Sequence, residues 1–363
     1  MPTYCLMLLA TVAFALAAVY YPQSIRVRLN HSGSLLRLKP SHLLMFLSFL
    51  PLFLVSALRY KVGVDYLSYT YIFQDINAGK ASHTEAGYEL LNRLVGAYTA
   101  DAQWIYALSA AISLALIVWG IYRYSVNPAY SLFLFVTMGY LFSSFNILRQ
   151  YVAIALIFAA LQLVREKRFL PFCIVVLLAA TFHKTAIIMI PLYFLLRLRL
   201  KQSYMLMITM VGMGCIPLRG VLTNLLVNTF YPQYAGTDLI QPLSTFEFIY
   251  YALVFGLLVL LCFRYKGRFF QNTYNLILFN CVFYSFLIYL CLSFVPEINR
   301  IAVYMEFFVI LLIPRLFACE ENPKVRRLYY VLSTLFFLAF FFLSVGVMGR
   351  YNVVPYSTVF SRP

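Results

Sequence analysis

One arginine lies inside a long apolar stretch of the sequence. Residues 129–164 carry a single charged side chain, Arg149, within the run SSFNILRQYVAIALIFAA (residues 143–160). A cation at the centre of a bilayer costs roughly 2.5–3.5 kcal/mol on insertion scales. A guanidinium can hold phosphate oxygens with two parallel hydrogen bonds. Arg149, with Gln150 beside it, is therefore a candidate ligand for an anionic group. The structural alternative is an arginine that snorkels from a helix end to the interface.

A histidine and a lysine interrupt the next apolar stretch. Residues 169–196 have basic clusters at both ends, and a single crossing would place the later basic loops outside the cell. We therefore predict two short helices of about 13 residues, broken at His183–Lys184 and too short to cross a core of about 30 Å. Broken backbone at that depth must line a water-filled cavity or be covered by protein. Arg149, at a turn between two spans, and His183–Lys184 are expected to line an outward-facing vestibule. The alternative for His183 is hydrogen-bonded packing.

The run ALRYKVGVDYLSYTYIF (residues 57–73) places ionisable and aromatic side chains at the outer end of the second span. Three ionisable side chains fall at the interface: Arg59, Lys61 and Asp65. The helical face that follows is aromatic and apolar: Tyr66, Tyr69, Phe73 and Ile76. A helix that lies along the membrane interface fits this pattern. The structural alternative is an aromatic belt with snorkelling cations.

The run EAGYELLNRLVGAY (residues 85–98) repeats the amphipathic pattern. One predicted face is apolar and aromatic: Tyr88, Leu91, Val95 and Tyr98. The polar residues are expected on the rest of the helix: Glu85, Glu89 and Asn92. A solvated surface helix is the alternative to a functional one.

The run PEINRIAVYMEFF (residues 296–308) adds two acids and an arginine. Glu297 and Arg300 are predicted at the outer mouth, and Glu306 lies roughly two turns deeper. A buried acid needs a cationic or hydrogen-bonding partner. The sequence does not identify the partner of Glu306.

The composition explains what must position these residues. Of 363 residues, 63% are hydrophobic and 11% are charged, whereas soluble domains carry about a quarter charged residues. Apolar runs of about 17–25 residues recur along the chain, which predicts an all-α polytopic membrane protein. We predict a single transmembrane domain over residues 1–363, with external loops at about 59–101 and 220–245. The first span, about Thr3 to Tyr21, lacks a basic leading segment and is expected to be retained.

The charge distribution predicts an orientation and excludes a nucleic-acid partner. The net charge is +16, but the basic residues cluster in short loops between apolar runs. Alternating spans place 18 of the 28 lysines and arginines on one side, which should be the cytoplasm, with both termini outside. Eight of the 12 acids then lie outside. The seven cysteines form no CxxC pair and lie near no histidine cluster, which disfavours disulfides and zinc.

Several chemistries lack their motifs. The sequence has no P-loop, no GxGxxG, no metal-ligand triad and no GxSxG. The candidate residues concentrate on the external side, away from ATP and nucleotide sugars. A substrate there must bring its own activated bond.

Five segments, in order, resemble motifs of the EpsG-like and Wzy-type polysaccharide polymerases. The segments are LRYKVGVDYLSY, EAGYELLNRLV, NILRQYVAIAL, KRFLPFCIVVLLAATFHKTAIIMIPLYFL and INRIAVYMEFFVILLIP, and they span about residues 57–314. Residues 220–245 match no motif of the family. The resemblance implies a fold related to C-type glycosyltransferases, with roughly ten to twelve spans that include short, broken or re-entrant helices.

The resemblance also implies an activity. The family joins a growing glycan to the next undecaprenyl-diphosphate-linked repeat unit, so the expected product is O-antigen or a related surface polysaccharide. The expected location is the bacterial inner membrane, with the active face periplasmic. The lipid bilayer and the lipid-linked oligosaccharide are the expected partners, and docking of a chain-length regulator is left open.

The candidate residues can be given roles in such a transfer. A base takes the proton of the acceptor hydroxyl, and cations stabilise the charge that grows on the diphosphate. Arg149 and Arg300 are assigned to the diphosphate, and His183 or Asp65 is the base. The expected substrate-binding residues are Arg59, Tyr66, Tyr69, Glu85, Tyr88, Gln150, Lys184 and Glu297, with the tyrosines stacking on sugar rings. No metal or other cofactor is expected, because arginines supply the positive charge.

Three alternatives differ in class. A lipid-linked oligosaccharide flippase should carry charges along both halves of a translocation path, which the external concentration of polar residues disfavours. A membrane O-acyltransferase would need a histidine near the cytoplasmic face, whereas His183 is predicted on the other side. An O-antigen ligase uses the same donor and similar arginines, and the sequence excludes it least well.

Overall fold

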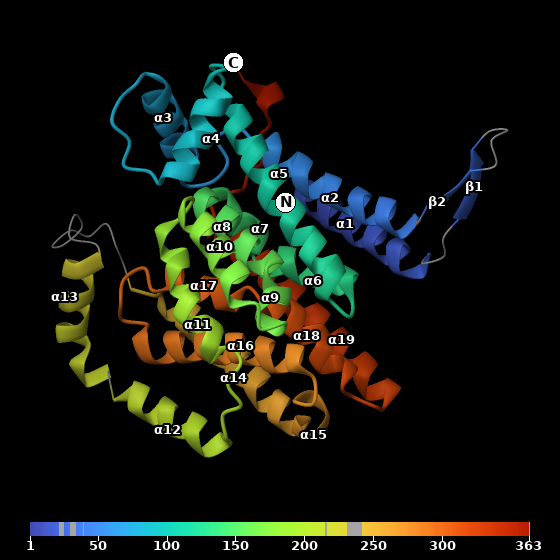
Figure 1. Cartoon of the computed structure of the whole chain (residues 1–363), viewed down its shortest axis with the longest axis vertical. Helices are drawn as coiled ribbons and strands as arrows, with labels where there is room; N and C mark the ends of the chain where they lie inside the picture. The colour runs from blue at the N-terminus through green and yellow to red at the C-terminus, as the bar shows by residue number, and fades with distance from the viewer. Residues whose placement is uncertain (22–24, 30–33, 39, 215, 231–241, 363) are drawn as a thin grey trace. The chain divides into compact units, whose positions relative to one another are not determined.

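The computed structural model describes residues 1–21, 25–29, 34–38, 40–214, 216–230 and 242–362 (Figure 1). Within these residues the chain is helical apart from one antiparallel hairpin of β1 (Ile25–Leu29) and β2 (Ser34–Leu38) and an isolated bridge between Arg59 and Thr358. The predicted all-α membrane class is therefore confirmed. The predicted external loop at about 220–245 lies partly outside the described residues, at 231–241.

The chain forms two compact units. Unit 1 comprises residues 1–159, 178–184 and 322–363, and unit 2 comprises residues 160–177 and 185–321. The single membrane domain expected over residues 1–363 stays a prediction.

In unit 1, α1 packs against α2 and α6, α5 packs against α2 and α8, and α6 packs against α19. Figure 1 shows α1 and α2 running side by side. The helices of this unit are α1 (Pro2–Tyr20), α2 (Pro40–Ala57), α3 (Tyr66–Asn77), α4 (Ala86–Gly96), α5 (Gln103–Tyr124), α6 (Pro128–Thr137), α7 (Tyr140–Asn146), α8 (Leu148–Ala159), α19 (Pro323–Phe341), the π-helical turn η4 (Phe342–Val347) and the 3-10 turn η5 (Val359–Ser361).

In unit 2, α16 is the central helix, because it contacts α9, α12, α14, α17 and α18. The helices are α9 (Leu161–Arg165), α10 (Phe169–Ala180, whose last turn belongs to unit 1), η1 (Lys184–Ile188), α11 (Met189–Leu195), α12 (Gln202–Met213), η2 (Ile216–Leu218), α13 (Arg219–Phe230), α14 (Thr245–Arg264), α15 (Lys266–Phe269), α16 (Thr273–Leu292), α17 (Asn299–Glu306) and α18 (Val309–Ala318).

Seven helices of the described residues are long and apolar enough to cross a membrane, or eight if one bent pair forms a single span. The seven are Pro2–Tyr20, Gln103–Tyr124, Gln202–Leu225, Thr245–Arg264, Thr273–Leu292, Asn299–Ala318 and Pro323–Val347. Shorter apolar helices accompany them at Ser41–Ala57, Leu148–Ala159, Phe169–Ala180 and Lys184–Leu195. The chain is thus a multi-pass membrane protein by helix length and hydropathy.

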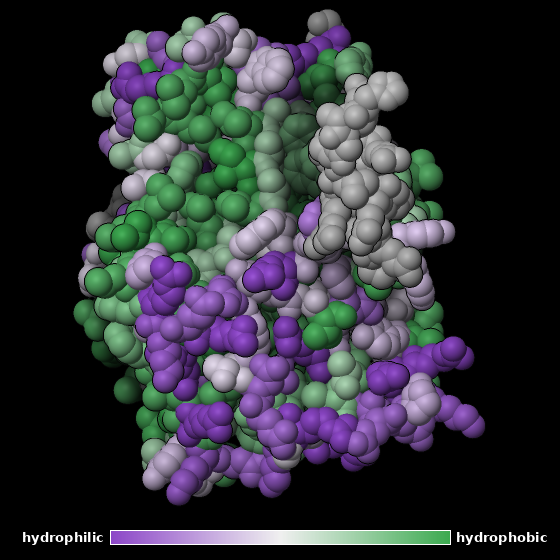
Figure 2. Space-filling view, turned by 45° about the vertical axis from the view of Figure 1, so that its right-hand side comes forward, coloured by the Kyte–Doolittle hydropathy of each residue, from purple (hydrophilic) through white to green (hydrophobic). Residues whose placement is uncertain are grey.

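The surface agrees with a lipid environment. Exposed leucines and isoleucines recur at helical spacing along α14, at Ile249, Leu253, Leu257 and Leu260. A similar face runs along α19, at Leu328, Val331, Leu332 and Leu335. Figure 2 shows hydrophobic side chains gathered into broad areas of the face that it draws. Monomeric soluble proteins rarely expose large contiguous apolar patches, so these faces are suited to acyl chains.

The predicted break in residues 169–196 is confirmed. The helix α10 ends at Ala180, and a 3-10 turn restarts the chain at Lys184. Arg149 also lies at a turn as predicted, because α7 ends at Asn146 and α8 begins at Leu148. The structure adds a bend of 52° between α6 and α7, at Met138–Gly139, which the sequence analysis did not predict.

Candidate functional site

Glu85 is the centre of an ionic cluster in unit 1, which we call the Glu85 cluster (Glu85, Arg149, His183 and Lys184). One carboxylate oxygen of Glu85 accepts a hydrogen bond from the guanidinium of Arg149. The other, Oε1, lies 3.2 Å from the backbone N–H of Lys184 and 3.4 Å from Nδ1 of His183. The polar residues that the sequence suggested for one vestibule therefore meet on a single carboxylate.

Glu85 is ionised in this environment. Burial alone would raise the pKa of its carboxyl, but the hydrogen bond from His183, the charge of Arg149 and backbone N–H groups outweigh it and lower the pKa to about 2. The carboxylate therefore compensates the positive charge of Arg149, whose side chain is 25% exposed.

The start of α4 is shaped to bring Glu85 to His183. Glu85 is the N-cap residue of α4 and has extended backbone, which aims the helix start at the end of α10. The N–H of Gly87 donates to the carbonyl of Thr181 at 2.8 Å. A Cβ at Gly87 would lie 2.9 Å from that carbonyl oxygen and closer still to the Thr181 side chain. Glycine in the EAGY segment therefore permits the close approach that joins the two segments.

Tyrosine rings support the cationic side of the cluster. The guanidinium carbon of Arg149 lies 5.9 Å from the centre of the Tyr88 ring, within the range of a cation–π contact. Tyr69 also contacts Arg149. Burial raises the pKa of the Tyr69 hydroxyl, Arg149 lowers it, and the charge of Asp65 raises it. Asp65, half-buried at the start of α3, is thus within electrostatic reach of Tyr69.

The predicted aromatic face of α3 is confirmed, and it is a packing face. Tyr66, Tyr69, Phe73 and Ile76 are all buried. The first three, with Tyr88, Tyr106 and Leu148, belong to one core cluster. Stacking of Tyr66, Tyr69 and Tyr88 on sugar rings stays a prediction, because these rings pack against protein side chains here.

Arg59 lies in an aromatic cage. Its side chain is 1% exposed, and its guanidinium carbon lies 4.7 Å from the ring centre of Phe145 and 5.0 Å from that of Tyr106. Its Nη1 donates to the carbonyl of Val62 at 2.6 Å. The structure thus gives this arginine a packing environment, and its contact with substrate stays a prediction.

The loop of residues 58–65 is fixed by a glycine and by the side chain of Asn146. Gly63 has φ +104°, and a Cβ there would lie 2.7 Å from Oδ1 of Asn146. That oxygen accepts the N–H of Val64 at 2.7 Å, and Nδ2 of Asn146 donates to the carbonyl of Tyr351 at 3.2 Å. The loop of residues 58–65 and the NILRQ segment (residues 146–150) are therefore packed closely and joined by a hydrogen bond.

The predicted face of α4 is wrong in two positions. Asn92 is fully buried, and its Nδ2 donates to the carbonyl of Tyr88, one helical turn earlier, at 2.7 Å. Tyr98 is 91% exposed, because α4 ends at Gly96 and the helical spacing does not continue to residue 98.

The C-terminal residues 349–362, which we call the C-terminal strap, reach this region. The backbone pairs with residues 58–60, through Val359 N–H to Leu58 and Tyr60 N–H to Ser357, at 2.9 Å each. Arg362 forms an ion pair with Asp101 at 2.7 Å and donates to Gln103 at 2.8 Å. Arg362 and Asp101 help to line a cavity of about 260 Å³ beside Tyr66. This contribution could not be predicted from the sequence, since nothing local links residues 101 and 362.

The remaining predicted residues lie elsewhere. Gln150 is 1% exposed, on α8 next to Arg149. In unit 2, Nε of Arg300 donates to Glu297 at 2.6 Å, and both side chains are partly exposed. Glu306 is buried, and the structure supplies a partner that the sequence could not identify: the hydroxyl of Tyr289, whose ring stacks on Tyr251 at 3.7 Å between centroids.

Among the described residues, no group of three or more His, Cys, Asp or Glu side chains is arranged to hold a metal ion. The Glu85 cluster instead combines an anchored guanidinium, an imidazole beside a carboxylate and an exposed lysine. Such a set can bind an anion and accept a proton.

Of three comparisons with known proteins, one gave a match. The search of the curated proteins and the search of the solved structures found no match. The model of the EpsG family matches residues 42–358, which include every segment of the Glu85 cluster. The chain therefore belongs to the EpsG family, whose members are membrane proteins of exopolysaccharide biosynthesis.

Proposed function

We propose that this protein polymerises lipid-linked oligosaccharide repeat units at the periplasmic face of the bacterial inner membrane. An acceptor sugar hydroxyl attacks the anomeric carbon of a glycan carried on undecaprenyl diphosphate. The new bond joins the hydroxyl oxygen to that carbon, and the bond from the carbon to the diphosphate oxygen breaks. The diphosphate leaves with the bonding electrons, and a base takes the hydroxyl proton. A single displacement of this kind inverts the anomeric configuration.

The observation that carries the proposal is the Glu85 cluster. It holds a cation and a potential base on one ionised carboxylate, and its four residues come from three parts of the chain that are distant in sequence. A diphosphate leaving group needs fixed positive charge, and the acceptor hydroxyl needs a base. The cluster offers both, in a family of polysaccharide biosynthesis.

Arg149 is assigned to the diphosphate. Glu85 holds one side of its guanidinium, and Tyr88 lies beside it. An anchored guanidinium loses little freedom when it binds a phosphate. Lys184 is exposed and follows His183 directly, so it is assigned as a second cation for the leaving group.

His183 is preferred to Asp65 as the base. Its Nδ1 lies 3.4 Å from Glu85, and a carboxylate at that nitrogen orients the ring so that Nε2 is the proton acceptor. Glu85 is then a positioning residue. Asp65 remains the alternative base, because it also lies near Tyr69 at the outer end of the core cluster.

The other predicted residues are assigned by their surroundings. Arg59, Tyr66, Tyr69, Tyr88 and Gln150 are buried, and we assign them to holding the cluster in place. Arg300 and Glu297, in unit 2, stay sequence-based proposals for the diphosphate and the substrate, and Arg300→Ala tests the former separately. Docking of a chain-length regulator stays open.

A surface-polysaccharide gel tests the function in the host. The gene is deleted and then restored as wild type, as Arg149→Ala or as Arg93→Ala, whose arginine forms an exposed pair with Glu89. We expect the lipopolysaccharide or capsule ladder to collapse to one repeat on deletion. Wild type and Arg93→Ala should restore the ladder, and Arg149→Ala should not.

The same gel separates the alternatives. A strain with no repeat attached at all would favour a flippase or an O-antigen ligase. An unchanged ladder would contradict polymerisation of that glycan.

A further inference from the structure

Unit 2 contains a cavity separate from the one beside Tyr66, and none of its lining residues has a role in the proposed glycosyl transfer. It has a volume of about 350 Å³ and is bordered by residues 199–205, by α14 and α15, and by α16. This is at the small end of ligand pockets, which span about 300–1,000 Å³. The cavity can therefore hold a small headgroup with the beginning of an apolar tail.

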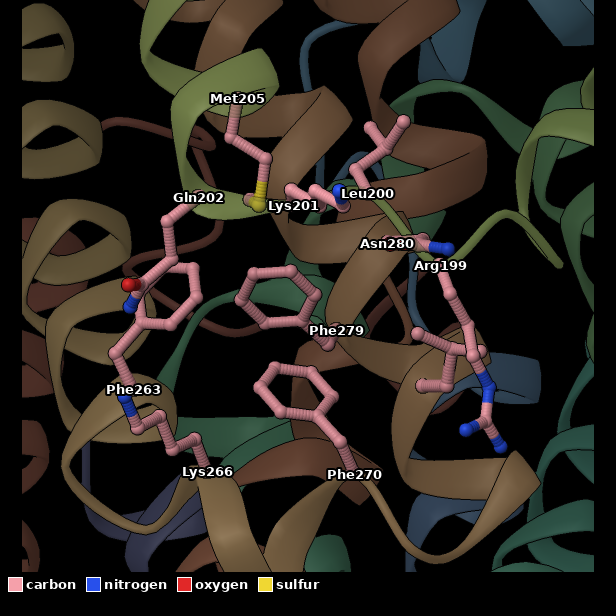
Figure 3. Close-up of a pocket in the computed structure, with 11 residues that line it drawn as sticks. Arg199, Leu200, Lys201, Gln202, Met205, Phe263, Lys266, Phe270, Phe279 and Asn280 are labelled. Carbon is pink, nitrogen blue, oxygen red and sulfur yellow. The ribbon is translucent and has the colours of Figure 1, made fainter.

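Three phenylalanine rings form the apolar wall. The ring of Phe279 lies 5.0 Å from that of Phe270 and 5.5 Å from that of Phe263, between centroids, and both pairs pack edge to face. Met205 and Leu276 complete the wall, and both are buried. Figure 3 shows Phe270 and Phe279 at the centre of the cavity, with Phe263 to one side.

Three cations surround these rings. Arg199, Lys201 and Lys266 line the cavity, and all three are exposed. Figure 3 shows them on different sides of the Phe270–Phe279 pair. Within the described part of the chain, no carboxylate forms an ion pair with any of them. Other cations of the same loops do have partners: Arg268 pairs with Glu321, and Arg197 lies over Tyr193.

A buried amide holds the loop that carries two of the cations. Nδ2 of Asn280, on α16, donates to the carbonyls of Leu196 and Leu198 at 2.9 Å each. Asn280 is itself 1% exposed. The chain leaving α11 is therefore fixed just before Arg199, so the cations are presented by an anchored segment.

We propose that this cavity binds the headgroup of an anionic glycerophospholipid, with the phosphate among Arg199, Lys201 and Lys266 and the acyl chains leaving along the phenylalanine wall. Charge complementarity selects the anion, because the lining contains three cations and no acid. The apolar wall selects a lipid over a free phosphate. The cytoplasmic leaflet follows from the charge-based topology, which places the loops at 197–201 and 264–268 on that side.

Lipid titration of the purified full chain tests this site. Native mass spectrometry in detergent gives the apparent Kd for phosphatidylglycerol, for phosphatidylcholine with the same acyl chains, and for glycerol phosphate. The test variant is Arg199→Gln/Lys201→Gln/Lys266→Gln. The matched control, Arg123→Gln/Lys324→Gln/Arg327→Gln, removes the same charge from exposed residues on the same predicted side.

We expect phosphatidylglycerol to bind at least about tenfold more tightly than phosphatidylcholine, and the test variant to lose at least about tenfold in its affinity for phosphatidylglycerol. The control variant should keep the wild-type affinity. Equal losses in both variants would show a diffuse attraction of charge and overturn the site. Equal binding of the two lipids, or tight binding of glycerol phosphate alone, would overturn the assigned ligand.

Discussion

At the scale of single residues, Glu85 offsets the free-energy cost of holding Arg149 in a half-buried position. An arginine among apolar side chains needs an anion, and an ionised carboxylate with a pKa lowered to about 2 supplies it. The same carboxylate lies beside His183 and Lys184. Glu85 therefore both neutralises the charge of Arg149 and orients the imidazole of His183.

Removal of the charge on Glu85 should disturb structure and activity together. In Glu85→Gln, Arg149 loses its counter-charge, which should cost about 1–3 kcal/mol, less than a fully buried pair because both side chains keep some contact with solvent. We expect a lower thermal unfolding midpoint in detergent and loss of the polymer ladder. The matched control is Glu89→Gln, whose partner Arg93 is exposed. Equal effects of the two variants would contradict the central role of Glu85.

The low pKa of Glu85 predicts a pH dependence of stability. Because the pKa is lowered from 4.5 to about 2 on folding, the carboxylate stabilises the folded state above pH 4.5. This contribution should disappear as the pH falls from about 4.5 to about 2. Unfolding midpoints measured across this range should therefore converge for wild type and Glu85→Gln. A difference that stays constant would show that the carboxylate has no such linkage.

At the scale of elements, short broken helices bring the cluster together. The start of α4 contributes Glu85, and the first turn of α8 contributes Arg149. The junction between α10 and η1 contributes the His183 side chain and the Lys184 N–H. The first backbone N–H groups of a helix have no partner inside the helix. Glu85 accepts a hydrogen bond from one of them, the N–H of Lys184 at the start of η1. The broken helices thus supply polar backbone groups to the cluster. Such groups need a hydrogen-bond partner or water, so the helix ends are expected to face a water-filled space.

The contact between α4 and Thr181 should be sensitive to one methyl group. Gly87→Ala places a Cβ 2.9 Å from the Thr181 carbonyl oxygen, which forces the two segments apart. We expect destabilisation of about 1–3 kcal/mol and loss of activity, since overpacking shifts the backbone. Gly220→Ala is the control, because no atom lies within 4 Å of its added Cβ. Unfolding midpoints and the polysaccharide gel measure both effects, and a wild-type result for Gly87→Ala would refute this role.

The spacing of apolar and charged residues in the sequence predicted several local features of the fold correctly. The buried face of α3, the break after Ala180 and the turn before Arg149 follow from spacing and charge alone. The bend at Met138–Gly139, the ion pair of Arg362 with Asp101 and the bond of Tyr289 to Glu306 could not be predicted in this way. The ion pair and the Tyr289–Glu306 hydrogen bond depend on contacts between separate segments, which a single sequence does not show.

At the scale of the whole molecule, the basic loops predict one orientation in the membrane. Within unit 2, Arg165 and Arg315 both lie over the ring of Tyr274, at 4.5 and 5.2 Å. The charge count placed the loops of both arginines on the cytoplasmic side. Their meeting on one ring agrees with that placement.

Reporter fusions test the orientation. An alkaline phosphatase fused after the last residue should be active, because both termini are predicted outside. A fluorescent protein that folds only in the cytoplasm, fused after Lys201, should fluoresce. The reverse pattern would invert the topology and move the Glu85 cluster to the cytoplasmic face, against the proposed substrate.

The most direct test of the central claim is polymerisation by the purified protein. Lipid-linked repeat units extracted from the deletion strain serve as substrate, and the release of undecaprenyl diphosphate is measured together with chain growth. We predict turnover by wild type and by Arg93→Ala, and a rate lower by about 10²–10³ in Arg149→Ala. Chain growth at the wild-type rate in Arg149→Ala, or no turnover by the wild type, would contradict glycosyl transfer at the Glu85 cluster.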